Sequence, residues 1–537
     1  MLLASRHIAD PEPPVDLLDS RWTATWASLF LLALIVRLVF LPITFNNTTD
    51  AWSRLHNAQL WLHHPTALPP ATSHDAWLPL HFWLLGTALW VIKSETAARV
   101  FTVLLSTLTV VLCAGVWARA FGRRIALASS LVLALFGFHI AFSITTSSEA
   151  PTIFFLAAGI YGWVRYAAEA RLRWLLLSTL ALVAASLCRF EAWLVPPVLS
   201  LTLLDFSRGW SSVFSNGAAW RKSLRFAVCT SSGAVGWVIF SFMRWGDPFE
   251  LPHRTIWLNT HFRPTVLHHS LYFRLLTVPG SLLISLSPLV AALAALGLVV
   301  VIARARGTAR SLALVVLVLL GFNWWNSIRY EVTQARYTLL YSWLLIPFAF
   351  EALRWISTRW RGAASRAAFS AVIGFFVLWQ LGIMLGAVYA PPSVADRLSV
   401  LSPTQPLHHE MRGLTAWLQA NSSSYDTVIL DDFNWESSAV SRFAKLDPTK
   451  TFEISAEDYA KPAALKAELA QFVKQRHPNL LICSPYGPIG SAWSIDNRKT
   501  AVVEDLGMQL DLRWQGEHWR IYTISYRPAS LPASPTP

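Results

Sequence analysis

The chain has 537 residues, of which 54% are hydrophobic, only 14% are charged and 27 are tryptophan. Such a composition excludes a soluble globular protein, because a chain this apolar has lipid as most of its solvent. The formal net charge is +13, but most Lys and Arg residues lie in short loops between apolar runs, where they set membrane orientation. The basic balance therefore does not indicate a nucleic-acid partner.

The first 22 residues are polar and acidic, with four Asp or Glu residues and three prolines ahead of the first apolar run. A cleaved signal instead has a basic start and a short apolar core. Residues 1–22 are therefore predicted to be a cytosolic N-terminal tail.

Apolar segments fill the next part of the chain. A helix needs about 20 mostly apolar residues to cross a membrane. The sequence contains about eleven such segments, so residues 23–390 are predicted to form a polytopic α-helical membrane domain. The predicted spans lie near 24–43, 97–117, 124–142, 150–166, 173–188, 192–206, 224–243, 281–303, 310–325, 337–356 and 367–390.

One further apolar segment, residues 77–93, is short for a span and contains Pro79. If it does not cross, the basic loops that follow all fall on the side of the N-terminal tail. The positive-inside rule then makes that side the cytoplasm. We therefore expect this segment to form an interfacial or re-entrant helix at the outer face.

This topology gathers acidic residues on the outer face. An outer loop from 44 to 97 contains Asp50 and Asp75, and two later outer turns contain Glu149 and Glu191. These four acids lie far apart in the sequence. The topology nevertheless predicts that they share one side of the membrane.

The chain leaves the membrane near Ala390, and the apolar fraction then falls. Between 391 and 527, strand-like runs such as "DTVILDDF" and "NLLICSPYG" alternate with a helical pattern. This alternation predicts a small α/β soluble domain on the outer face. Residues 528–537, which are rich in Ser, Pro and Ala, are predicted to be a disordered tail.

The motif search removes several classes of protein. No nucleotide-binding glycine loop, serine nucleophile elbow or HExxH motif appears, which excludes most ATP-driven pumps and the commoner soluble hydrolases. The four cysteines show neither disulfide nor metal-ligand spacing, so no metal site is predicted. Carboxylates, arginines and aromatic residues on one membrane face remain as the candidates for chemistry.

Each candidate also has a purely structural interpretation. Asp50 and Glu149 both stand where a helix begins, so either carboxylate could serve only as a helix cap. Arg189 and Glu191 could simply pair with each other at a helix break. Arg37 lies within the first span, where an arginine either extends its side chain to the membrane surface or has a functional role.

Taken together, the pattern resembles the C-type (GT-C fold) membrane glycosyltransferases that use polyprenyl-phosphate sugars. It is most similar to the protein O-mannosyltransferase and lipid A aminoarabinose transferase group. The resemblance extends from about Trp26 to Ala352. The segments that carry it are "RLVFLPITF", "TTDAWSRLHNAQLW", "LPLHFWLLG", "SETAARVFTVLLSTLTVVL", "ARAFGRRIALASSLVLAL", "SSEAPTIFFLAAGIYGW", "CRFEAWLVPP" and "RYTLLYSWLLIPFAFEAL".

The resemblance implies roles for several residues. An acid of the first outer loop is the catalytic base in relatives, and it matches Asp50. A second acid at the next outer turn matches Glu149, and Arg336 with Tyr337 match a region that helps to hold the lipid phosphate. One departure is that Ala51 follows Asp50 where many relatives have a second acid.

A second departure concerns the phosphate-binding cation. Relatives often carry Lys or His directly before a "PPL" sequence, whereas "SHDAWLPL" puts His74 and Asp75 three residues further away. The resemblance therefore leaves open which cation binds the phosphate. The C-terminal domain carries no motif from the family.

The chemistry of this reaction fits these residue types. A phosphate leaving group is stable as an anion, so no general acid is needed, but cations must hold its developing charge. Arg329, Arg336, Arg189 or His74 could supply that charge. Asp50 would accept the proton of the acceptor hydroxyl, and attack opposite the phosphate would invert the anomeric centre.

Glu149 would orient the acceptor or the base. Asp75, Glu191 and Tyr337 complete the predicted substrate-binding set. A divalent cation between Asp50 and Glu149 would be compatible with this chemistry, but the ligand count does not predict one.

Two other classes of function compete with the enzyme. A lipid or sugar transporter would place charges within paired or discontinuous spans and show internal repeats, which are not evident here. A non-catalytic receptor or scaffold would use the soluble domain to bind partners. Few cysteines and short loops favour a bacterial inner membrane protein, with the N-terminus in the cytoplasm and the C-terminal domain in the periplasm.

Overall fold

A computed structural model describes residues 20–46, 51–63, 77–204, 216–261, 270–304, 307–357, 363–404, 409–431, 437–447, 449–454, 462–485, 487, 489, 493, 495 and 499–526. The chain forms two compact units, which we call the helical unit and the sheet unit. The helical unit combines Met1–Phe45 with Ala76–Gln405, and the sheet unit combines Asn46–Asp75 with Pro406–Pro537.

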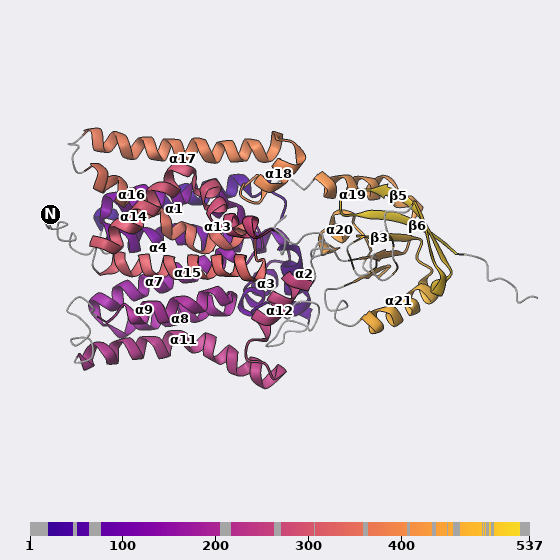
Figure 1. Ribbon diagram of the computed structural model, residues 1–537, viewed down its shortest axis with the longest axis horizontal. Helices are drawn as coiled ribbons and strands as arrows, with labels where there is room; N and C mark the ends of the chain where they lie inside the picture. The colour runs from indigo at the N-terminus through magenta and orange to yellow at the C-terminus, as the bar shows by residue number, and fades with distance from the viewer. Residues whose placement is uncertain are drawn as a thin grey trace, which may run out of the picture. The chain divides into compact units, whose positions relative to one another are not determined.

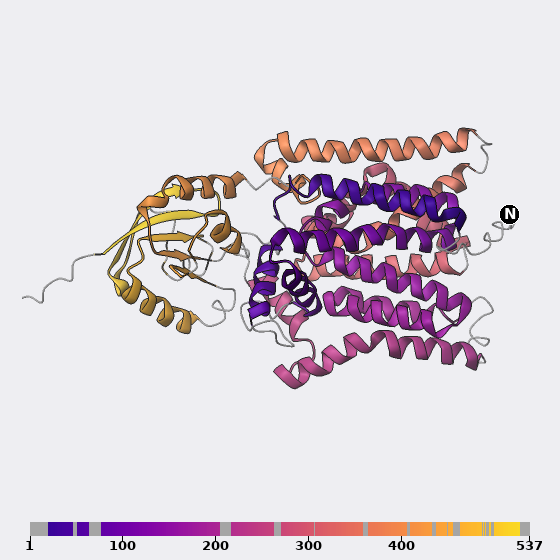
Figure 2. The same ribbon diagram turned by 180° about the vertical axis from the view of Figure 1, so that it is seen from behind.

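The helical unit is a bundle of helices that run side by side (Figures 1 and 2). Its helices are α1 (Ser20–Phe40), α3 (Leu80–Val91), α4 (Glu95–Phe121), α5 (Arg123–Ala134), α6 (Gly137–Ser143), α7 (Glu149–Glu169), α8 (Leu172–Cys188), η1 (Phe190–Leu194), α9 (Val195–Leu201), α11 (Gly217–Trp245), α12 (Glu250–His261), α13 (Leu271–Leu286), α14 (Pro288–Arg304), α15 (Thr308–Tyr330), η4 (Ala335–Thr338), α16 (Leu339–Ser357), α17 (Ala363–Tyr389) and α18 (Pro392–Ser399).

The protein is a multi-pass membrane protein by the length and hydropathy of these helices. Among the described residues, six helices are long and apolar enough to cross a membrane, or up to eight if each bent helix pair counts as one span. The count of eleven is not confirmed. Two of the predicted spans are bent, by 57° between α5 and α6 and by 112° between α13 and α14, and α8 and the segment Phe190–Leu201 are shorter apolar helices.

Close backbone contacts fix the helices that carry the functional candidates. A side chain at Gly162 on α7 would lie 2.8 Å from the Ser178 backbone nitrogen on α8, and Ser178 Oγ donates to the Gly159 carbonyl at 2.8 Å. A side chain at Gly297 on α14 would overlap the Phe348 carbonyl of α16. The backbones of α7 and α8, and those of α14 and α16, therefore lie so close together that these positions leave no room for a side chain.

The two helix bends share one polar clamp. Gln380 on α17 accepts a hydrogen bond from the Gly137 amide at the start of α6 (3.1 Å) and donates to the Ser285 carbonyl near the end of α13 (2.8 Å). At the first bend, Arg37 is fully buried rather than extended to the surface, and it hydrogen-bonds Ser106 Oγ at 2.9 Å and His139 Nδ1 at 2.8 Å. Polar side chains thus hold the backbone in place where the helices bend.

The sheet unit confirms the predicted C-terminal sheet domain. Its strands are β1 (Val428–Leu430), β2 (Thr451–Glu453), β3 (Leu480–Cys483), β4 (Thr500–Val503), β5 (Met508–Gln515) and β6 (Arg520–Tyr526). They form a six-stranded sheet of order β2-β1-β3-β6-β5-β4. Strand β1 pairs with β2 and β3 in parallel, and the other pairs are antiparallel.

Apolar side chains form the core of this sheet. Buried residues such as Ile429, Leu481 and Tyr522 lie at its centre. The helices of the unit are α2 (Ala51–His63), α19 (His409–Ala420), η5 (Ser422–Ser424), α20 (Ser437–Phe443), α21 (Pro462–Arg476) and η7 (Glu504–Leu506). The helix α2 follows Asp50 in the sequence and contacts α20.

Candidate functional site

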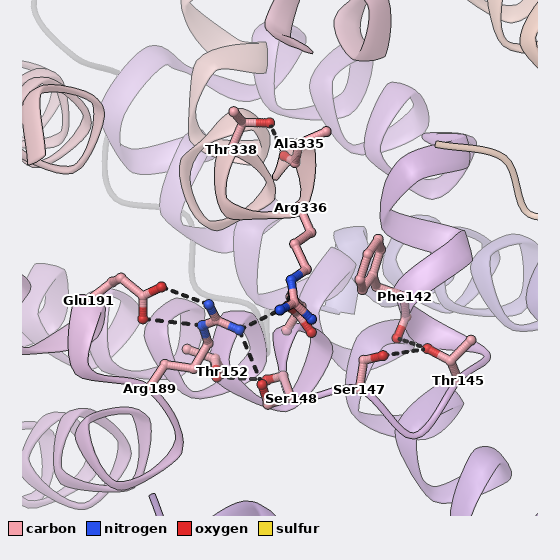
Figure 3. Close-up of polar contacts among 11 residues, drawn as sticks. Phe142, Thr145, Ser147, Ser148, Thr152, Arg189, Glu191, Ala335, Arg336 and Thr338 are labelled. Atoms are coloured by element: carbon pink, nitrogen blue, oxygen red, sulfur yellow. Dashed lines mark hydrogen bonds and ion pairs between the residues drawn. The ribbon is translucent and has the colours of Figure 1, made fainter. Parts of the chain in front are cut away.

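Four charged residues from three separate segments meet in the helical unit (Figure 3). Glu149 is the first residue of α7, Arg189 is the extended residue that ends α8, Glu191 lies in η1, and Arg336 lies in η4 just before α16. All four are almost completely buried. We call this group the charge cluster.

Arg189 is the centre of the charge cluster. Its Nε and Nη2 donate to the two carboxylate oxygens of Glu191 at 3.2 and 2.7 Å, which is a bidentate pair. Its Nη1 donates to Glu149 Oε1 at 2.8 Å and to Ser148 Oγ at 3.2 Å. Such charge-assisted bonds are short and strong, and they fix the position of both carboxylates.

Arg336 is the second cation of the charge cluster. Its Nε lies 4.0 Å from Glu149 Oε1, which is a longer contact than either carboxylate makes with Arg189. The ring of Tyr337 lies 5.2 Å from the Arg189 guanidinium and 5.3 Å from that of Arg336. Of the two guanidinium groups, that of Arg336 therefore has the longer contact to Glu149.

The charges of the cluster balance, with two guanidinium groups against two carboxylates. Burial by itself lowers the pKa of Arg189, but the Glu191 and Glu149 carboxylates outweigh burial and raise its pKa above the ordinary value. Arg189 therefore stays charged at any relevant pH. A buried pair of this kind is retained only where each charge has partners, because an isolated charge is costly to desolvate.

A hydroxyl-rich turn supports the first residue of α7. Thr145 Oγ1 donates to Ser147 Oγ at 3.1 Å, Thr152 Oγ1 donates to the Ser148 carbonyl at 2.7 Å, and Ser148 Oγ accepts from Arg189. The sequence prediction did not include Ser148 as a site residue. The run of hydroxyl residues directly before Glu149 was the available signal.

A cavity of about 350 Å³ lies beside the charge cluster. Glu191 and Tyr337 form part of its wall, and aromatic side chains form much of the rest. Two carboxamides of α15, Asn323 and Asn326, also face it. The lining residues are Phe190, Glu191, Trp193, Leu194, Phe249, Pro252, Thr255, Ile256, Leu319, Phe322, Asn323, Trp325, Asn326, Tyr330, Val332, Tyr337, Leu340 and Tyr341.

The structure describes only some of the other predicted site residues. Asp50, His74 and Asp75 lie outside the described residues. Arg329 is exposed near the end of α15, where its guanidinium lies 6.0 Å from the ring of Tyr330. Within the part of the chain that the structure describes, no group of three His, Cys, Asp or Glu side chains could hold a metal ion.

Comparison with known proteins supports the fold. A family model described as dolichyl-phosphate-mannose-protein mannosyltransferase matches residues 63–237, which contain Glu149, Arg189 and Glu191. The fold is also similar to that of ArnT from Cupriavidus metallidurans in the apo state, at 14% identity and a TM-score of 0.55 over 93% of this chain and 98% of that one.

A second structure of that ArnT, bound to undecaprenyl phosphate, matches at 14% identity with a TM-score of 0.54, over 94% of this chain and 98% of that one. A search of curated protein sequences finds no match. The fold that the resemblance predicts is confirmed: the chain shares the fold of these two ArnT structures.

Removal of Arg189 should destabilise the helical unit. In Arg189→Gln, Glu149 and Glu191 stay buried without their main counter-charge, and breaking such a pair costs about 3 to 5 kcal/mol. We expect a clearly lower thermal unfolding temperature for the purified variant in detergent. Arg329→Gln is the matched control, because Arg329 is exposed, and it should unfold close to the wild-type temperature. Equal unfolding temperatures for the two variants would contradict a structural role for Arg189.

Proposed function

We propose that the protein transfers a sugar from a polyprenyl-phosphate donor to an acceptor hydroxyl at the outer face of the membrane. The observation that carries this proposal is the buried charge cluster beside an aromatic cavity. The cluster residues Glu149, Arg189 and Glu191 lie within the segment that the mannosyltransferase family model matches. The sugar and the acceptor, which is a lipid, a polysaccharide or a protein, are left open by this proposal.

Arg336 binds the donor phosphate in this proposal. Its guanidinium is a planar fork of donors that suits phosphate oxygens, and it has the looser contact to Glu149. Arg189 is a positioning residue, because its own donors are already used by Glu149 and Glu191. The aromatic cavity next to Tyr337 accepts the apolar part of the donor nearest the phosphate.

Asp50 is the proposed catalytic base. The departing phosphate needs no proton, so the protein only has to remove the proton of the acceptor hydroxyl as attack proceeds. Direct attack opposite the phosphate inverts the anomeric centre. Glu149 orients the acceptor, since its carboxylate is held at 2.8 Å by Arg189. His74, Asp75 and Arg329 remain predicted contributors to substrate binding.

We also propose that the protein lies in a bacterial inner membrane, with its N-terminus in the cytoplasm and its sheet unit in the periplasm. Single cysteines test this orientation. Asn216→Cys should be shielded from an impermeant thiol reagent in intact cells, whereas Ser270→Cys and Ser422→Cys should react. All three positions are exposed, and the native cysteines are buried or half-buried, so background labelling should be low. Labelling of Asn216→Cys alone would invert the topology.

Binding of the donor phosphate should depend on the charge of Arg336. Arg336→Ala should weaken binding of undecaprenyl phosphate by roughly tenfold or more, the worth of a hydrogen bond to a charged group. Arg336→Lys keeps the positive charge without the planar set of donors, so its affinity for the lipid should fall less than that of Arg336→Ala. Binding is measured by titrating the lipid in detergent and following thermal stabilisation. Arg244→Ala, at an exposed position near the end of α11, is the control. A larger loss in Arg329→Ala than in Arg336→Ala would transfer the role to Arg329.

Asp50→Asn should separate catalysis from folding. Asn caps helices about as well as Asp, so expression and lipid binding should survive, but Asn cannot accept a proton. We expect turnover to fall by roughly 10² to 10⁴, the usual contribution of a positioned base. Turnover is followed as release of polyprenyl phosphate from a panel of polyprenyl-phosphate sugars, with membrane extract as the source of acceptor.

Asp50→Glu should recover little turnover, because the extra methylene moves the carboxylate by about 1 Å and the geometry at the hydroxyl is strict. Near wild-type turnover in Asp50→Asn would remove the base assignment and favour Glu149. A chain that binds the lipid but releases no polyprenyl phosphate from any donor would contradict sugar transfer itself.

A further inference from the structure

A second charged group lies at the other end of α7. Glu169 is the last residue of α7, and its carboxylate forms ion pairs with four arginines. The N–O distances are 2.7 Å to Arg165, 3.7 Å to both Arg171 and Arg173, and 4.0 Å to Arg119 of α4. One carboxylate therefore lies among four guanidinium groups. We call these five residues the basic cluster.

The basic cluster carries an excess of positive charge. Four guanidinium groups against one carboxylate leave three positive charges. Between Thr96 and Phe190 the sequence contains two acids, Glu149 and Glu169. Glu149 is too far away to neutralise the basic cluster, because α7 has 21 residues and its length separates Glu149 from Glu169 by about 30 Å.

An aromatic ring gives the basic cluster a fixed shape. Trp174 on α8 donates from its indole nitrogen to Glu169 at 2.8 Å. The same ring lies 4.5 Å from the Arg165 guanidinium and 4.8 Å from that of Arg173. Cation–π contacts of this kind hold the guanidinium groups without neutralising them. Tryptophan also prefers the membrane–water interface, which places the cluster at the level of lipid headgroups.

The cluster has a buried part and an accessible part. The side chains of Arg165 and Arg119 are 6% and 9% exposed, whereas those of Arg171 and Arg173 are 63% and 59% exposed. A fifth cation lies nearby, because Lys222 of α11 donates to the Ala167 carbonyl at 2.8 Å. An anion can therefore approach Arg171 and Arg173 from outside while the buried arginines add to the local positive potential.

We propose that the basic cluster binds the headgroup of an anionic membrane phospholipid. The site lies where α4, α7, α8 and α11 pack together, about one membrane thickness from the charge cluster. Arg171 and Arg173 contact the lipid phosphate, and Trp174 packs against the glycerol region. Basic pockets between membrane helices are suited to such headgroups. This site is separate from the proposed donor site and does not depend on it.

The test compares lipids of different charge. The full-length chain is reconstituted in nanodiscs of phosphatidylcholine alone or with added phosphatidylglycerol, and retained lipid and the thermal unfolding temperature are measured. Wild type should retain phosphatidylglycerol and unfold at a higher temperature in its presence. Arg171→Gln with Arg173→Gln should weaken this retention by roughly fivefold per arginine, hence about 25-fold together.

Two further variants make the result specific. Arg310→Gln with Arg366→Gln removes the same charge from exposed positions at the start of α15 and α17, outside the basic cluster, and should behave like wild type. Arg171→Lys with Arg173→Lys keeps the charge and should retain most of the binding. Equal losses in the cluster and control variants would overturn the proposal in favour of general surface charge. Equal stabilisation by soluble glycerol phosphate would overturn it in favour of a free anion.

Discussion

The buried pairing of Arg189 with two carboxylates is the interaction on which the rest of the site depends. It joins the start of α7 to the break between α8 and η1, which lies 40 residues further along the chain. Each carboxylate is held by the same cation, so the loss of that cation would leave two buried negative charges. The position of Arg336 follows from this arrangement, because Glu149 is also its ion-pair partner.

The balanced charges of the charge cluster affect which anions it can bind. A buried site with balanced charges attracts a soluble anion such as free phosphate less strongly than a site with excess positive charge does. In the proposed function, an incoming phosphate draws Arg336 away from Glu149, and burial of the apolar lipid in the adjacent cavity offsets the cost of that exchange. That proposal implies a ligand with both a phosphate and an apolar chain, which favours a lipid phosphate over its soluble counterparts.

Sequence reasoning was strongest where a local signal existed. The charge parity of the loops put Glu149 and Glu191 on one membrane face, and the structure does bring them together through Arg189. The Gln380 clamp could not be predicted, because its partners are 243 and 95 residues away and no local pattern encodes that contact. The count of spans was not confirmed for a related reason, since bends and short helices depend on packing inside the bundle rather than on hydropathy alone.

Gln380 gives the helical unit an unusual mechanical property. The same amide group satisfies a backbone N–H at one bent helix and a backbone carbonyl at the other, and in the apolar interior neither group has water as a substitute. If one bend straightened, the Gln380 amide would have to give up a hydrogen bond, or the helix at the other bend would have to move as well. A change at either bend would therefore break a hydrogen bond of Gln380, so α17 links the two bends although they lie far apart in the sequence.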